Sequence, residues 1–62
     1  MTKSEALDFV RLYRTDLQFS HDDLVECYIA LSGQQPTARD WRKLGHIGIW
    51  ARCCALADQE QS

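Results

Sequence analysis

Residues 44 to 54 read LGHIGIWARCC, and this stretch decides how the last helical region of the chain is built. Gly45 and Gly48 stand in a region whose apolar residues are otherwise spaced as in a helix. Each glycine inside a helix costs about 1 kcal/mol relative to alanine. Two arrangements therefore stay open: one continuous helix, or two helical pieces separated at the glycines.

Capping signals upstream of this stretch divide the 62-residue chain. Thr2 and Glu5 form a capping-box pattern, and Ser20 precedes two aspartates that favour the positive end of a helix dipole. Thr37 repeats the pattern with Asp40 three residues on. Each of these three signals predicts the start of a helix, and Gly33 stands where a left-handed cap would end the second one.

The pattern as a whole predicts an all-α fold, because no segment alternates with period two for long enough to form a strand. We expect a three-helix unit with helices near residues 4–15, 21–32 and 38–57. These helices form a single domain over residues 1–62, with a polar C-terminal tail from about residue 58.

The composition points to self-association. Hydrophobic residues make up 45% of the chain, including six aromatic residues. A core of this size rarely supplies more than about 3–5 kcal/mol of stability without a disulfide, a metal or a partner chain. We therefore expect a homodimer, in which a second copy covers apolar surface that one small core cannot hide.

The third helix is the predicted centre of that dimer. On a continuous helix Trp41 and Trp50 are nine residues apart and lie on opposite faces. Trp41 then belongs to the core face, and Trp50 belongs to an outward contact surface. The predicted interface comprises Trp41, Leu44, Ile47, Gly48, Trp50 and Cys53. In the alternative arrangement, the glycines break the helix and bring both tryptophans into one core.

Metal binding and catalysis are not predicted. On a continuous helix His46 and Cys53 lie about 10 Å apart along the axis, whereas zinc needs donors about 2.0–2.3 Å from one point. The three cysteines, two of them adjacent, fit no disulfide framework, and we expect reduced thiols. We predict no metal, no cofactor, no catalytic residue and no enzyme activity.

DNA binding is the alternative function. Arg39, Arg42 and Lys43 lie close together in a possible helix-turn-helix, with its turn at Gly33 or at Gly45–Gly48. Basic side chains of this kind contact phosphates. The net charge of −2 opposes this reading, and a solvated helix face explains the same residues.

The sequence contains no run of 18 apolar residues, so we expect no membrane association through a spanning helix. The first residues, MTKSEALDF, lack the apolar core of a signal peptide. The expected location is therefore the cytoplasm.

Residues 4–33, SEALDFVRLYRTDLQFSHDDLVECYIALSG, resemble a small accessory protein of lambdoid bacteriophages. Such proteins are encoded early, between the exonuclease and excisionase genes. The resemblance implies a small helical, oligomeric regulator in the host bacterial cytoplasm that favours lytic development by binding a host factor. It carries no catalytic or ligand motif, so no functional residue is transferred from it.

Overall fold

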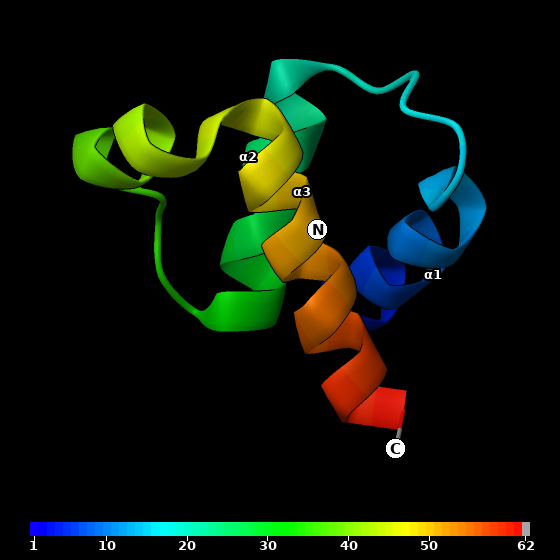
Figure 1. Cartoon of the computed structure of the whole chain (residues 1–62). Helices are drawn as coiled ribbons and strands as arrows, with labels where there is room; N and C mark the ends of the chain where they lie inside the picture. Colours follow the sequence, from blue (N-terminus) through cyan, green and yellow to red (C-terminus); the bar gives the residue numbers. More distant parts are fainter. Residues whose placement is uncertain (62) are drawn as a thin grey trace.

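Three helices make up the fold in a computed structural model that describes residues 1–61 (Figure 1). Helix α1 spans Lys3–Tyr13, α2 spans His21–Ser32 and α3 spans Ala38–Gln61. The all-α prediction is confirmed, and the bounds of α2 agree with the expected ones. Within the described residues, no helix is both long enough and apolar enough to cross a membrane.

The first two helices begin at the predicted caps. The Thr2 hydroxyl accepts a hydrogen bond from the Glu5 N–H at 3.1 Å, and the Glu5 carboxylate accepts one from the Thr2 N–H at 2.8 Å. The Ser20 hydroxyl accepts from the Asp23 N–H at 3.2 Å. These bonds satisfy N–H groups that a helix N-terminus leaves without intrahelical partners.

The end of α2 and the start of α3 are also capped by local hydrogen bonds. Gly33 has a φ of 78° and ψ of 5°, a left-handed conformation that favours glycine, and its N–H donates to the Ile29 carbonyl at 2.8 Å. After a short turn, Thr37 and Asp40 exchange hydrogen bonds of 3.0 and 3.1 Å. Both turn signals therefore lie where the sequence places them.

Helix α3 is broken at Gly45, where φ is 67° and ψ is −175°. Only glycine adopts this combination readily. The break divides α3 into a short segment, residues 38–44, and a long segment, residues 46–61. Figure 1 shows the short segment in green to yellow, projecting away from the axis of the long segment. The chain thus takes the arrangement with two helical pieces.

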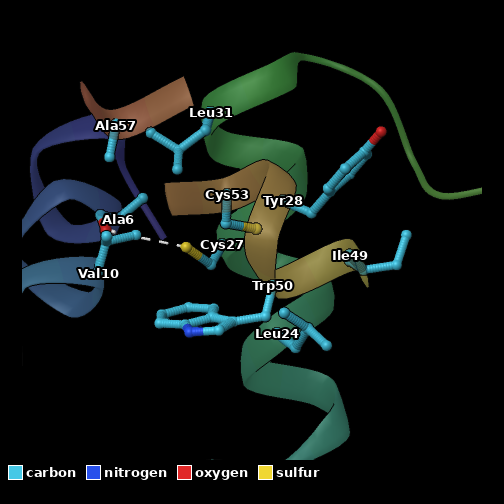
Figure 2. Close-up of a cluster of buried hydrophobic side chains, with 10 residues drawn as sticks. All are labelled: Ala6, Val10, Leu24, Cys27, Tyr28, Leu31, Ile49, Trp50, Cys53 and Ala57. Atoms are coloured by element: carbon cyan, nitrogen blue, oxygen red, sulfur yellow. Dashed lines mark hydrogen bonds between the residues drawn. The ribbon is translucent and has the colours of Figure 1, made fainter. Parts of the chain in front are cut away.

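The core lies where α1 and α2 meet the long segment (Figure 2). It contains small and large apolar side chains from all three helices: Ala6, Val10, Leu24, Cys27, Tyr28, Leu31, Ile49, Trp50, Cys53 and Ala57. Their burial, rather than intrinsic helix propensity, is what stabilises helices of this length.

Trp50 is buried, so its predicted place on an outward contact surface is wrong. Only 5% of Trp50 is exposed. Its ring lies edge-on to Phe9, with centroids 5.8 Å apart, and 4.6 Å from Phe19. Trp41 is half-buried and packs against the same core. The break at Gly45 changes the direction of the helix between the two tryptophans. Trp41 and Trp50 therefore do not lie on opposite faces of one helix, as they would if α3 were continuous.

The C-terminal end of α3 also differs from the prediction, because the helix continues to Gln61 instead of ending near residue 57. Two ion pairs hold this end against α1. Lys3 Nζ lies 2.7 Å from Glu60 Oε1, and an Arg14 guanidinium nitrogen lies 2.6 Å from Asp58 Oδ1. The predicted polar tail is therefore helical as far as Gln61, and Ser62 lies outside the described residues.

Candidate interaction surface

The outward side of the long segment carries exposed apolar residues. Ile47, Ala51 and Ala55 are exposed and lie four residues apart, so they form one stripe along the helix. We call these three residues the outer stripe. Ile47 is the large apolar side chain of this stripe and is 67% exposed. The residues of the same segment that face the core, including Ile49 and Cys53, are fully buried.

The predicted interface residues are divided between surface and core. Ile47 is exposed, and Trp41, Leu44 and Gly48 are partly buried. Trp50 and Cys53 belong to the chain's own core, and the prediction that they contact a second chain is wrong on that ground. A buried side chain cannot meet a partner while the fold stays intact.

Gly48 sits where the chain turns back after the break. A Cβ added at this position would lie 2.6 Å from Leu44 Cβ, closer than real Cβ atoms approach. The missing side chain therefore lets the first turn of the long segment pack closely on the last turn of the short one.

The basic side chains lie on the short segment. Arg39, Arg42 and Lys43 are all exposed, and their spacing places them on one side of the helix. Arg42 and Lys43 make no ion pair within the part of the chain that the structure describes. The segment has only seven residues, about 10 Å of helix.

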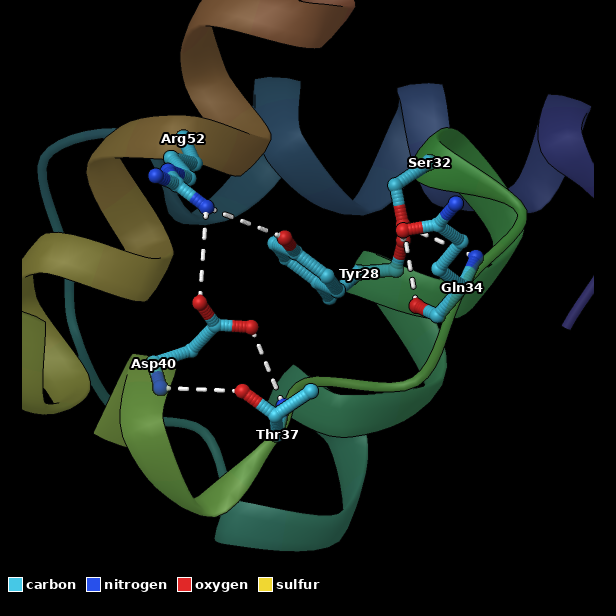
Figure 3. Close-up of polar contacts among 6 residues, drawn as sticks. All are labelled: Tyr28, Ser32, Gln34, Thr37, Asp40 and Arg52. Carbon is cyan, nitrogen blue, oxygen red and sulfur yellow. Dashed lines mark hydrogen bonds and ion pairs between the residues drawn. The ribbon is translucent and has the colours of Figure 1, made fainter. Parts of the chain in front are cut away.

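An arginine connects the two segments of α3 to α2 (Figure 3). The Arg52 guanidinium donates to the Tyr28 hydroxyl at 3.4 Å and lies 3.9 Å from an Asp40 carboxylate oxygen. Asp40 also accepts a hydrogen bond from the Thr37 backbone N–H, which together with the positive charge of Arg52 lowers the pKa of Asp40. Arg52 thus helps to hold the short segment in place.

Two histidines meet beside Trp41. His21 Nδ1 lies 2.9 Å from His46 Nε2, within hydrogen-bond distance, although the residues are 25 positions apart. The Trp41 ring centroid is 4.8 Å from that of His21 and 5.0 Å from that of His46. Both histidines are exposed. We call these three side chains the His–Trp cluster; nothing in the sequence spacing indicates it, because only the break at Gly45 brings His46 back to the start of α2.

The three cysteines are free thiols, and two of them belong to the core. Cys27 Sγ lies 3.8 Å from the Ala6 carbonyl oxygen, to which it donates. The hydrogen bond with Cys27 and burial raise the pKa of Cys53. Burial also raises the pKa of Cys54. Cys53 and Cys54 therefore resist forming the thiolate that nucleophilic attack and zinc binding require, whereas the hydrogen bond with Cys53 lowers the pKa of Cys27.

The described residues contain no group of three or more histidine, cysteine or acidic side chains that could hold a metal ion. A hollow of about 140 Å³ lies between α1 and the end of α3, lined by Leu7, Val10, Arg11, Arg14, Ala57 and Asp58. Pockets for small-molecule ligands are usually about 300–1,000 Å³. The hollow is therefore small for an organic substrate.

No protein-family model, no curated protein and no solved structure matches this chain.

Proposed function

We propose that this chain is a small non-enzymatic interaction protein that binds other protein chains through the outer stripe of α3. The alignment of exposed Ile47 with exposed Ala51 and Ala55 supports the proposal, because side chains four residues apart form one continuous apolar surface that a second helix can cover. Ala51 and Ala55 continue the stripe for two further turns. Their small side chains allow another helix to approach closely.

The first partner is a second copy, giving a homodimer with α3 at its centre. A two-fold axis would place the same stripe of each protomer against the other, so that Ile47 meets the alanines of the facing helix. Trp41, Leu44 and Gly48 are partly exposed at the same end of the helix and extend the contact. This surface keeps Trp41, Leu44, Ile47 and Gly48 of the predicted interface, leaves out the core residues Trp50 and Cys53, and adds Ala51 and Ala55.

The experiment is sedimentation equilibrium at micromolar concentration. We expect a mass of twice the 7.2 kDa chain for the wild type and of one chain for Ile47→Asp, since burying an unpaired carboxylate in an apolar contact is costly. Leu12→Asp is the matched control: Leu12 is 71% exposed on α1, away from the stripe, and this variant should stay dimeric. A monomeric wild type, or dissociation by Leu12→Asp alone, would contradict the proposal.

The biological setting of this function is proposed from the resemblance of residues 4–33 to lambdoid phage accessory proteins. The chain would act in the host bacterial cytoplasm as an early factor that favours lytic development by binding a host protein. Recovery of one host protein from bacterial lysate by the wild type, with loss in Ile47→Asp and retention in Leu12→Asp, is the expected result. If both variants recovered the host protein equally well, the host protein would not bind through the outer stripe.

A second candidate function, DNA binding, has one specific observation in its favour: Arg42 and Lys43 are exposed and make no ion pair with described residues. The net charge of −2 and the shortness of the segment that carries them weigh against it. We expect only weak binding that disappears as salt rises.

Gel shifts separate the two functions. Binding tighter than about micromolar at about 0.15 M salt would be unusual for non-specific contacts. If such binding were lost when Arg39, Arg42 and Lys43 are all changed to Gln, the protein would be a DNA-binding regulator. We expect the triple variant to fold, because exposed charges of this kind contribute about 0–1 kcal/mol each.

A further inference from the structure

Although the sequence alone predicts no metal site, we propose that His21 and His46, which the fold brings together, form a binding site for a divalent first-row transition-metal ion. The two imidazole nitrogens that face each other, Nδ1 of His21 and Nε2 of His46, are 2.9 Å apart. Two nitrogens bound to one ion at about 2.0–2.1 Å lie about 2.9 Å apart when the bonds are at right angles, and about 3.3 Å apart at the tetrahedral angle. The observed separation therefore already matches adjacent positions of a square-planar or octahedral ion.

The chemistry of the pair fits the same class of ion. Imidazole is a ligand for nickel, copper and zinc, and right-angled nitrogen ligands are typical of nickel and copper. In the metal-free chain one of the two nitrogens carries a hydrogen and the other accepts it. Binding replaces this hydrogen bond: the hydrogen moves to the far nitrogen of its own ring, and both lone pairs turn toward the ion. Both rings are exposed, so water can occupy the remaining coordination positions.

Trp41 holds the two imidazole rings close together, so that they need to move little when an ion binds. Its ring lies against both imidazoles, at centroid distances of 4.8 and 5.0 Å, and the two imidazole centroids are 5.1 Å apart. Trp41 thus keeps the two rings side by side before an ion arrives, which reduces the entropy lost on binding.

The site also connects two parts of the fold. His21 is the first residue of α2, and His46 is the first residue after the break in α3. An ion held by both would cross-link the start of α2 to the point where α3 changes direction. Because an unfolded chain does not hold the two rings together, binding should stabilise the folded state.

Titration of the full chain with Ni²⁺ by calorimetry is the test. We expect one ion per chain, and affinity weaker by about 10²-fold in His21→Gln and in His46→Gln, because the second imidazole of a chelate binds at a high effective concentration. Both substitutions change exposed side chains, and far-ultraviolet circular dichroism checks that the helices remain. Cys54→Ser is the matched control for a thiol ligand, and it should bind Ni²⁺ as the wild type does.

Tryptophan fluorescence locates the ion independently. Ni²⁺ quenches nearby tryptophans, so the emission of Trp41 should fall while that of buried Trp50 persists. Trp41→Phe should therefore lose most of the quenching and keep the calorimetric binding. The melting temperature of the wild type should rise with Ni²⁺, and that of His21→Gln should not. Affinity that survives the loss of either histidine, or that disappears in Cys54→Ser, would overturn the proposal.

Discussion

Gly45 is the residue on which the tertiary structure depends most directly. Its φ of 67° with ψ of −175° lies in a region that is essentially restricted to glycine, although a Cβ at this position would meet no neighbouring atom within 4 Å. Backbone conformation, not space, is therefore the constraint. Gly33 is also at positive φ, but its φ of 78° and ψ of 5° correspond to a left-handed helical turn that asparagine tolerates.

The two glycines give a matched pair of substitutions. We expect Gly45→Asn to lower the free energy of unfolding by about 1–3 kcal/mol. Asparagine would either adopt the strained backbone conformation of Gly45 or shift the backbone and disturb the packing on both sides of the break. Gly33→Asn should cost only a fraction of this, since asparagine is an accepted left-handed cap. Urea denaturation monitored by circular dichroism measures both. Equal losses in the two variants would mean that the break at Gly45 is not specific to glycine.

The start of α3 couples helix capping to pH. The Thr37 N–H donates to the Asp40 carboxylate, and this bond, aided by the charge of Arg52, lowers the pKa of Asp40 in the folded state. A lowered folded-state pKa means that ionised Asp40 stabilises the fold above the unfolded-state pKa of about 3.9. The contribution is lost as the pH falls through the folded-state pKa.

Asp40→Asn should therefore be less stable than the wild type near pH 7, and the difference should shrink on acidification from about pH 5 to about pH 2. Asparagine can still cap the helix as a neutral acceptor, so the pH-dependent part of the loss reports the charge. Urea midpoints measured across this range provide the comparison. Curves that stay parallel down to pH 2 would show that the Asp40 charge does not contribute.

The whole molecule depends on a core that the three helices share around Trp50. The ring of Trp50 contacts Phe9 of α1 and Phe19 of the connection between α1 and α2, and it lies beside Leu24 of α2 in the core (Figure 2). Removing a buried aromatic side chain of this kind costs about 3–5 kcal/mol. That is about the entire stability expected for a core of this size.

Trp50→Ala should accordingly leave the chain largely unfolded at 25 °C, with the helical circular dichroism signal lost. Trp41→Phe should remain folded, because Trp41 is only half-buried. A cooperative thermal transition of Trp50→Ala close to that of the wild type would show that the core tolerates a cavity at Trp50. Trp50 is part of the core of one chain, so a charged residue placed there would disrupt folding. A charged residue in place of exposed Ile47 leaves the core intact and therefore tests assembly.

Residue spacing along the chain is enough to predict the helical class, the caps at Thr2, Ser20 and Thr37, and the left-handed end of α2 at Gly33. These features depend on side chains and backbone groups a few residues apart, so local spacing is sufficient to predict them. The extension of α3 to Gln61 was missed because its ion pairs join residues more than 40 positions apart.

Two features depend on the tertiary structure and not on residue spacing: the side of α3 that faces the core, and the contact between His21 and His46. A break at one residue changes the direction of every side chain after it, and helical periodicity assumes that no such break occurs. The sequence shows that Gly45 permits the break but does not determine its angle. Packing of Trp50 against α1 and α2 selects that angle, and it thereby leaves Ile47 exposed and brings His46 to within 2.9 Å of His21.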